Sequence, residues 1–280
     1  MDTVTRFAPS PTGYLHLGHA YSALFAAEQA DGGRFLLRIE DIDGGRCRPE
    51  FDAAIAEDLQ WLGLSWAAPV RRQSKHMEDY ATALETLAGH GLIYPCFCTR
   101  KDIQAEIAAA GRAPHGPDGP LYPGTCRRLA ATEAAERVAA GAAHALRLMT
   151  DDAVRQAGPL HWHDRTEGTQ EARPDLFGDV VLARKDTPTS YHLAVTVDDH
   201  LQGVTLVTRG MDLFEATHVH CLLQALLDLD MPDYHHHRLL TGADGKRFAK
   251  RDRSETLRAL RDAGHTPARV RAMAGWEGAA

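Results

Sequence analysis

The sequence predicts an α/β fold in which helices cover both faces of a parallel sheet and a smaller module interrupts the chain. Two observations support this class. Short apolar segments with the character of buried strands alternate with amphipathic helical segments over residues 4–90, a pattern that favours a parallel sheet. Glycine and proline then make up eight of the sixteen residues from 111 to 126, too many for the interior of a helix or strand.

The first half of the predicted sheet comes from two strands and three helices. Val4–Ala8 is short and apolar and precedes Pro-Ser-Pro, so we expect a buried strand that runs into a loop. A helix over His19–Ala30 and a second strand over Arg34–Ile39 follow. Apolar stripes predict two further helices, one that Pro49 opens and one over about His76–His90.

The chain returns to this alternation after the Gly/Pro-rich stretch. Strands are expected at 179–183, 191–197 and 204–208, an amphipathic helix over about Leu213–Leu229, and helix again over 254–272. We therefore predict four parts along the chain. They are residues 1–93 as the first half of the sheet domain, 94–177 as the inserted module, 178–237 as the second half, and 238–280 as a basic loop with a C-terminal helical segment.

Composition narrows the class of protein. The 280 residues contain no run approaching the roughly 20 apolar residues of a membrane span, and no signal segment opens the chain. We therefore expect a cytoplasmic protein without membrane contact, and a monomer. Five cysteines favour reduced thiols or a metal site over a disulfide framework. The net charge of −7 disfavours nucleic acid as a partner, but ten Lys and Arg face four acidic residues between 238 and 271.

The segment His16-Leu17-Gly18-His19 stands where a loop rich in Pro and Gly meets a predicted helix start. Free backbone N–H groups and the helix dipole make such a place a ready anion site. Gly18 lets a ligand approach the backbone closely, and both histidines can donate hydrogen bonds to phosphate oxygens as charge develops on them. Two ordinary, partly exposed histidines are the alternative, which the strand, the prolines and the helix start outweigh.

Three cysteines around the Gly/Pro-rich stretch predict a structural Zn²⁺ site. Cys96, Cys98 and Cys126 offer three soft ligands, whereas zinc takes four, usually Cys or His. Chemistry alone nominates His115 as the fourth ligand, while Tyr122 stands four residues before Cys126. Three unrelated reduced cysteines are the alternative. Their grouping in an insert with little apolar sequence favours the metal.

Charged residues mark the ends of the predicted strands. Arg6 and Arg209 can each form a forked contact with a carboxylate. Glu40 ends a buried strand, where open α/β sheets place their ligands, and can hold an ammonium group; a cap or salt bridge is the alternative. The run from Asp198 to His200 is compatible with a magnesium or acid/base cluster. A turn that serves as a structural element at the end of the sheet is the favoured interpretation.

Three ordered segments resemble the glutamyl-tRNA synthetases, class I enzymes with a HIGH motif. They are RFAPSPTGYLHLGHA followed by LLRIEDID, then YHLAVTVDDHLQGVTLVTRGMDL at 191–213, and GKRFAKRD at 245–252, which resembles a variant KMSKS loop. The likeness covers most of the chain. It implies the Rossmann-type parallel sheet of class I aminoacyl-tRNA synthetases, with an inserted zinc-bearing α+β module and a short C-terminal helical segment.

Chain length favours the short relatives, the glutamyl-Q tRNA(Asp) synthetases. Full-length glutamyl-tRNA synthetases continue into a large helical anticodon-binding region, for which no sequence remains after Ala280. Val195, where full-length bacterial enzymes usually carry Asn, and the degenerate KMSKS loop point the same way. The resemblance implies ATP-dependent activation of L-glutamate and its transfer to the queuosine base in the anticodon of tRNA(Asp).

The same resemblance implies roles for individual residues. Glu40 takes the α-ammonium of glutamate, and Arg6 and Arg209 with Tyr191 take carboxylate; Ala8 and Ser10 complete this pocket. ATP, with Mg²⁺ bound through phosphates and water, contacts His16, Gly18, His19, Arg247 and Lys250. His16, His19 and Lys250 carry the catalysis. Tyr122 is favoured over His115 as the fourth zinc ligand. Arg247 and Ala249 depart from the KMSKS pattern, and the lost Ser hydroxyl puts one phosphate contact in question.

The implied chemistry has two steps, and three rival functions stay open. The glutamate α-carboxylate, with a pKa of about 3.5, needs no base to attack the α-phosphate of ATP. A hydroxyl of the modified nucleobase then takes the glutamyl group, and no side chain is identified as the general base for this step.

The rival functions are a truncated synthetase that charges the 3′ end of tRNA(Glu), a non-catalytic tRNA-binding adapter, and a small-molecule adenylyltransferase. The basic C-terminal segment is expected to contact the tRNA backbone.

Overall fold

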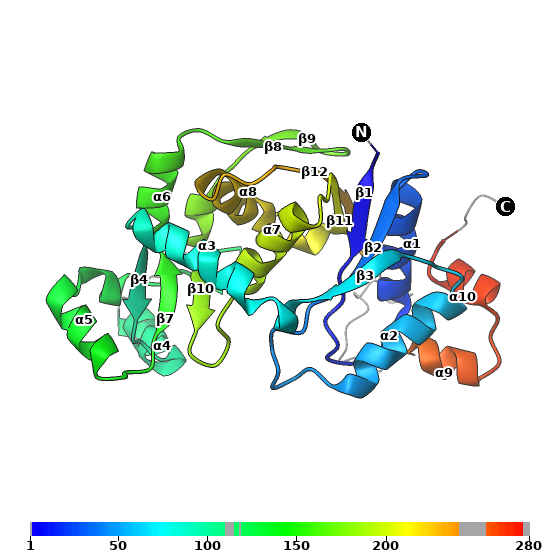
Figure 1. The fold of residues 1–280 in the computed structure, drawn as a ribbon, viewed down its shortest axis with the longest axis horizontal. Helices are drawn as coiled ribbons and strands as arrows, with labels where there is room; N and C mark the ends of the chain where they lie inside the picture. Colours follow the sequence, from blue (N-terminus) through cyan, green and yellow to red (C-terminus); the bar gives the residue numbers. More distant parts are fainter. Residues whose placement is uncertain (1, 110–114, 118, 241–255, 277–280) are drawn as a thin grey trace.

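The larger sheet joins two sets of parallel strands. The computed structural model describes residues 2–109, 115–117, 119–240 and 256–276 (Figure 1). One set pairs in the order β1-β2-β3 and the other in the order β11-β12-β8-β9, with only β9 antiparallel. The strands are β1 (Val4–Phe7), β2 (Arg34–Ile39), β3 (Ala67–Arg72), β8 (His161–Asp164), β9 (Gly168–Glu171), β11 (Leu206–Gly210) and β12 (Asp233–His237).

The two sets meet at β1 and β11, which lie side by side. The amide of Thr205, just before β11, donates to the carbonyl of Val4 at 3.0 Å. The strand order is therefore β3-β2-β1-β11-β12, and the chain changes direction across the sheet between β1 and β11. This arrangement confirms the predicted parallel sheet. Ligands of open α/β sheets bind at such a switch point, beyond the carboxyl ends of the strands.

Apolar side chains cover both faces of this sheet. In β2, Phe35 and Leu37 pack with the helices α1 and α2, whereas Leu36 packs with Trp162 and Tyr234 on the other face. Alternate residues of a strand point to opposite faces, so a continuous apolar run is what a doubly covered strand requires. The helices around the sheet are α1 (Leu17–Gln29), α2 (Pro49–Trp61), α3 (Met77–Gly89), α7 (Tyr191–Leu201), α8 (Ala216–Leu226), α9 (Leu257–Asp262) and α10 (Pro267–Met273).

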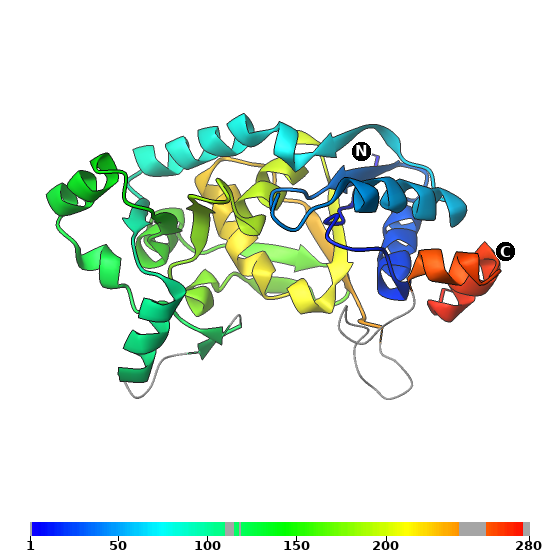
Figure 2. The same cartoon turned by 90° about the horizontal axis from the view of Figure 1, so that it is seen from below.

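The inserted module has its own antiparallel sheet in the order β4-β7-β10. It lies at the far end of the molecule from α9 and α10 (Figures 1 and 2). The elements of this region are β4 (Ile93–Cys96), α4 (Arg100–Ala109), β5 (His115–Gly116), β6 (Gly119–Pro120), α5 (Ala131–Ala139), β7 (Ala145–Leu148), α6 (Thr150–Ala157) and β10 (Val181–Arg184). Strand β10 thus pairs inside the module, whereas β8 and β9 join the larger sheet. No described helix is long and apolar enough to cross a membrane.

One predicted strand is wrong. Residues 191–197 begin the helix α7, which Ser190 caps by accepting a hydrogen bond from the amide of Leu193 at 3.4 Å. Every residue from Leu193 to Asp199 is buried, so the segment shows no polar face and its period cannot be recognised. The helix expected over 254–272 is two helices, because Gly264 has a φ of +84° and ends α9. The other predicted strands and helices lie within a few residues of their expected bounds.

Candidate active site

A pocket of about 630 Å³ opens at the carboxyl ends of β1, β2, β11 and β12. It lies at the switch point of the sheet, where the fold places ligands. All nine of the described residues that sequence analysis assigned to glutamate or ATP line it: Arg6, Ala8, Ser10, His16, Gly18, His19, Glu40, Tyr191 and Arg209. They come from segments up to two hundred positions apart. Arg247 and Lys250, assigned to the triphosphate, lie outside the described residues.

The two histidines of the HLGH segment cap the helix α1 in a reciprocal way. His16 Nδ1 accepts from the amide of Gly18 at 3.1 Å, and His19 Nδ1 accepts from the amide of His16 at 3.2 Å. Because each Nδ1 accepts, the neutral rings carry their hydrogen on Nε2, the form that can donate to an anion. The ring centroids are 3.8 Å apart. A Cβ on Gly18 would lie 3.0 Å from Cε1 of the His16 ring, so a larger residue would require that ring to shift.

The C-terminal segment reaches the same loop. The amide of Leu257 donates to the carbonyl of Leu15 at 2.8 Å, and His16 forms a bridge with Thr256. Leu257 is fully buried against the core around α1. The positions of Thr256 and α9 are thereby tied to the loop that precedes the HLGH histidines.

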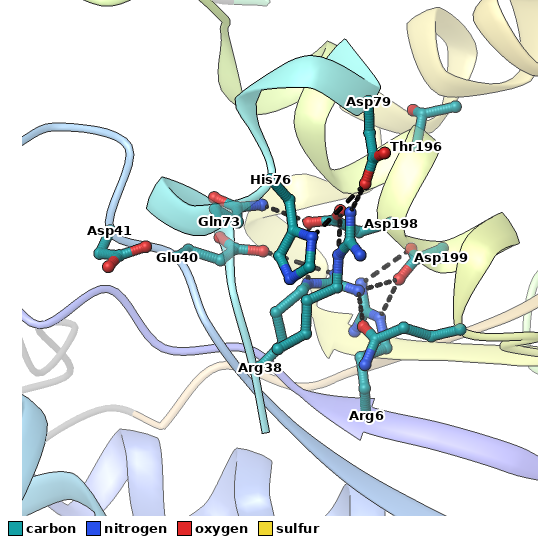
Figure 3. A network of polar contacts seen from close by, with 12 residues as sticks. Arg6, Arg38, Glu40, Asp41, Gln73, His76, Asp79, Thr196, Asp198 and Asp199 are labelled. Carbon is teal, nitrogen blue, oxygen red and sulfur yellow. Dashed lines mark hydrogen bonds and ion pairs between the residues drawn. The ribbon is translucent and has the colours of Figure 1, made fainter. Parts of the chain in front are cut away.

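Arg6 and Glu40 belong to a buried network of charges that sequence analysis did not foresee (Figure 3). Arg6 forms a forked contact with Asp199, through Nε at 2.9 Å and Nη2 at 3.3 Å, and its Nη1 donates to the carbonyl of Thr208. Arg38 is fully buried beneath the pocket and lies 2.8 Å from Asp199 and 3.5 Å from Glu40. The carboxylate that Arg6 contacts in the structure is therefore that of Asp199, a residue of the protein itself.

Asp198 anchors the other half of this network. It accepts from Arg71 Nε at 2.7 Å, from Gln73 Nε2 at 2.8 Å and from the hydroxyl of Tyr80 at 2.9 Å. The structural interpretation of the Asp198–His200 run is correct, although the run lies on α7 rather than in a turn. An arginine between buried apolar residues of one strand, as Arg38 stands between Leu37 and Ile39, is the sequence signal that could have marked a buried charge.

The pKa values of the two buried acids Glu40 and Asp199 are shifted in opposite directions. Burial raises the pKa of Glu40 to about 7, with Arg38 and Arg6 opposing the rise. Burial also acts to raise the pKa of Asp199, but the charges and hydrogen bonds of Arg6 and Arg38 outweigh it and hold that pKa below its ordinary value. Asp199 is thus a permanent anion of the scaffold, whereas Glu40 can gain or lose a proton near neutral pH.

Arg209 is surrounded by neutral donors and acceptors. Its guanidinium contacts Thr217 Oγ1 at 2.6 Å, His220 Nδ1 at 3.0 Å, His236 Nε2 at 3.1 Å and the Tyr191 hydroxyl at 3.5 Å. Burial, with the nearby Arg209 charge, lowers the pKa of His236 to about 4 and that of His220 well below its ordinary value. The histidines are therefore neutral at pH 7. Sequence analysis missed them, because neither the run of three histidines that contains His236 nor the helix that contains His220 carries a local signal of contact with Arg209.

The three cysteines of the predicted metal site converge in the inserted module. Their Sγ atoms all lie within 4.8 Å of one another, a group that contains no histidine among the described residues. The Tyr122 hydroxyl lies 3.3 Å from Cys96 Sγ and 3.5 Å from Cys98 Sγ. The amide of Phe97 donates to Cys126 Sγ at 3.3 Å, a contact that supports a thiolate ligand. Three sulfurs and one phenol oxygen make a donor set that fits Zn²⁺.

Fold and site together define the catalytic core of a class I aminoacyl-tRNA synthetase. The family model described as tRNA synthetases class I (E and Q), catalytic domain, matches residues 2–277. A glutamyl-Q tRNA(Asp) synthetase of Rhodobacter capsulatus is 49% identical over 279 residues, with 97% of this chain and 99% of that relative covered. The chain belongs to the glutamyl-Q tRNA(Asp) synthetase family within these class I enzymes, and it is a ligase.

Longer relatives are similar to the chain over part of their length. Glutamate–tRNA ligase 1 of Halorhodospira halophila is 39% identical over 277 residues, which cover 95% of this chain but 57% of that protein. A crystal structure of a glutamate tRNA ligase from Elizabethkingia meningosepticum, in complex with its amino acid, superposes with a TM-score of 0.76 at 28% identity. It matches 90% of this chain and 52% of its own.

Proposed function

We propose that the protein activates L-glutamate with ATP and transfers the glutamyl group to the queuosine base in the anticodon of tRNA(Asp). The convergence of nine predicted residues in one pocket at the switch point carries this proposal. The names of relatives that match nearly the full chain supply the acceptor. We further propose a cytoplasmic monomer and Mg²⁺ that accompanies ATP. The four predicted parts are kept with one change: β8 and β9 belong to the sheet domain and β10 belongs to the inserted module.

The first step joins the glutamate carboxylate to the α-phosphate of ATP, with pyrophosphate leaving. Glu40 holds the α-ammonium, while Arg209 and Tyr191 hold carboxylate, with Arg6 adding positive charge beside them. The Nε2–H groups of His16 and His19 and the start of α1 face the phosphates. Arg247 and Lys250 are proposed to meet the leaving pyrophosphate. Catalysis of this type is chiefly positioning and charge stabilisation.

The inserted module is proposed to hold Zn²⁺ through Cys96, Cys98, Cys126 and Tyr122. Bound there, the metal closes a loop that has little apolar surface of its own, and its contribution is structural. Cys96 and Cys126 are buried, and the four side chains come from β4, the loop after it and the segment before α5. The metal takes no part in either chemical step.

The first test is ATP–pyrophosphate exchange without tRNA, with glutamate, glutamine and aspartate compared. Exchange with glutamate alone is the expected result. Full-length glutamyl-tRNA synthetases generally need tRNA for this step, so exchange that requires tRNA(Glu) would favour a truncated synthetase instead. No exchange under either condition would favour the non-catalytic adapter.

The second test locates the product. Labelled glutamate is expected on tRNA(Asp) that carries queuosine, and equally on the same tRNA after removal of its 3′-terminal adenosine. The matched control is tRNA(Asp) with guanosine in place of queuosine, which should accept nothing. Loss of labelling with the terminal adenosine would contradict the proposal, because that result places the ester at the 3′ end.

A further inference from the structure

A second pocket of about 380 Å³ adjoins the first on the side of the inserted module. Both pockets are lined by Ser10, Thr12, Glu40, Arg46 and Tyr191, so they meet at the residues proposed to hold glutamate. The HLGH residues line only the first pocket. A second substrate can therefore reach activated glutamate through the second pocket without passing the phosphate-binding loop.

His192 stands on the wall of this second pocket. It occupies the first turn of α7, directly after Tyr191, and its side chain is half-buried. It also lines a third pocket of about 340 Å³, which extends to Tyr122 and Arg147 of the inserted module. The His192 ring thus borders the space between the glutamate site and the module, and the reaction steps described above do not use it.

Hydrogen bonds behind His192 determine which of its nitrogens carries the hydrogen. Arginine can only donate, so His220 Nδ1 must accept from Arg209 Nη1 at 3.0 Å, and the neutral His220 ring carries its hydrogen on Nε2. That Nε2 lies 3.1 Å from His192 Nδ1 and donates to it. His192 therefore carries its own hydrogen on Nε2, which has no hydrogen-bond partner among the described residues.

The ring is neutral, and this limits what it recognises. Burial, with the Arg209 charge, lowers the pKa of His192 to about 4. A neutral N–H in a half-buried position suits an uncharged oxygen, whereas a phosphate is better met by a guanidinium. Because Nε2 already holds a hydrogen, His192 cannot remove a proton from a hydroxyl through that atom. The residue is suited to position an acceptor, not to serve as its base.

We infer that His192 is a specificity residue for the transfer step, which donates its Nε2–H to an uncharged oxygen of the incoming modified nucleoside. This inference rests on the proposed function, since it assumes a hydroxyl-bearing base as the acceptor. Arg209 has two tasks in this arrangement. It faces the glutamate pocket, and through His220 it keeps the donor of His192 directed at the second pocket.

The test uses two half-isosteres of histidine. In His192→Asn the amide oxygen replaces Nδ1 and keeps the bond from His220, but nothing replaces the Nε2 donor; in His192→Gln the amide nitrogen reaches the Nε2 position. Two rates are measured: ATP–pyrophosphate exchange with glutamate alone, and glutamyl transfer to queuosine-bearing tRNA(Asp). We expect His192→Asn to exchange within about twofold of wild type and to lose at least about tenfold in kcat/KM for transfer. His192→Gln should recover most of that loss.

The outcomes separate this inference from the proposed function. Wild-type exchange without any transfer to tRNA(Asp) removes the proposed function, and the inference with it. Normal wild-type transfer that His192→Asn leaves unchanged overturns the inference alone. A parallel fall of exchange and transfer in both variants also overturns it, because that result describes a structural histidine. The exchange rate serves in addition as the check that each variant is folded.

Discussion

Glu40 faces opposing demands at the scale of a single residue. The proposed contact with the ammonium of glutamate requires an ionised carboxylate, yet burial disfavours the charge and raises the pKa of Glu40 to about 7. Arg38 at 3.5 Å opposes the shift without cancelling it. Because its pKa is raised, Glu40 in the folded protein without glutamate keeps its proton at pH values between the ordinary pKa of a carboxyl and about 7. In the proposed function, glutamate therefore displaces that proton when it binds.

We predict that glutamate binding strengthens as the pH rises from 6 to 8. With a pKa of about 7, roughly one tenth of Glu40 is ionised at pH 6 and nine tenths at pH 8, so the KM for glutamate should fall about tenfold over this range. The measurement is ATP–pyrophosphate exchange as a function of pH. Glu40→Gln should show a high KM that does not change with pH. The exposed Glu50→Gln should behave as wild type, and a pH-independent wild-type KM would contradict the prediction.

The residues that sequence could predict are those with a local signal. His16, Gly18, Glu40 and Arg209 stand at strand ends or a helix start, and the parallel order of the strands is enough to bring them together. Arg38 could not be placed, because its partner Asp199 is 161 positions away. The histidines around Arg209 are nearer in sequence, 11 and 27 positions away, but they lie on other elements, α8 and β12. Pairing across the fold depends on packing that no short stretch of sequence records.

At the scale of elements, α7 fixes the floor of the pocket through its two buried aspartates. Asp199 holds Arg6 and Arg38 (Figure 3). Asp198 holds Arg71 as well as Gln73 and Tyr80. Strands β1, β2 and β3 each contribute one of these arginines. Removing one partner of a buried pair leaves an uncompensated charge, which costs far more than the pair itself contributes.

We predict that Asp199→Asn destabilises the protein by about 3–5 kcal/mol, because Arg6 and Arg38 lose their shared carboxylate. Urea unfolding at pH 7 measures this. The control is Asp186→Asn in the exposed pair with Arg184, which should cost no more than about 1 kcal/mol. Since the pKa of Asp199 is depressed, its contribution is present at neutral pH and is lost as the pH falls below about 4. An equal loss of unfolding free energy in Asp199→Asn and Asp186→Asn would contradict the stabilising role of the network.

The cysteine cluster beside β4 leads to a prediction about metal content. Purified protein should contain about one Zn²⁺ per chain by elemental analysis, since the donor set offers four ligands. Cys98→Ser and Tyr122→Phe should each lower the zinc content, and a chelator should lower the Tm of the wild-type protein. Cys47→Ser, at a half-buried cysteine outside the cluster, is the matched control. Full zinc retention by Tyr122→Phe would leave a water or His115 as the fourth ligand.

At the scale of the whole molecule, basic charge is concentrated at the end opposite the inserted module. The chain as a whole carries −7, but helices α9 and α10 present Arg258 and Arg269 as exposed side chains. Arg261 differs from both of them. It lies 3.5 Å from Asp58, whose buried carboxyl has no hydrogen-bond partner among the described residues, and it also pairs with Glu57. Replacing Arg261 would leave the buried carboxyl of Asp58 without its arginine. A loss of stability could then be mistaken for a loss of tRNA binding.

We predict that Arg258 and Arg269 contact the tRNA backbone. Each phosphate contact that is lost should reduce the slope of log K against log salt by about 0.7–0.9, so replacing both arginines with Ser should reduce it by about 1.5. The measurement is tRNA(Asp) binding between low and physiological salt. Arg34→Ser is the control. This exposed arginine is the first residue of β2, whereas the pocket opens at the carboxyl ends of the strands. An unchanged slope in the double variant would place the tRNA elsewhere, since the loss of counterion release follows directly from the loss of a phosphate contact.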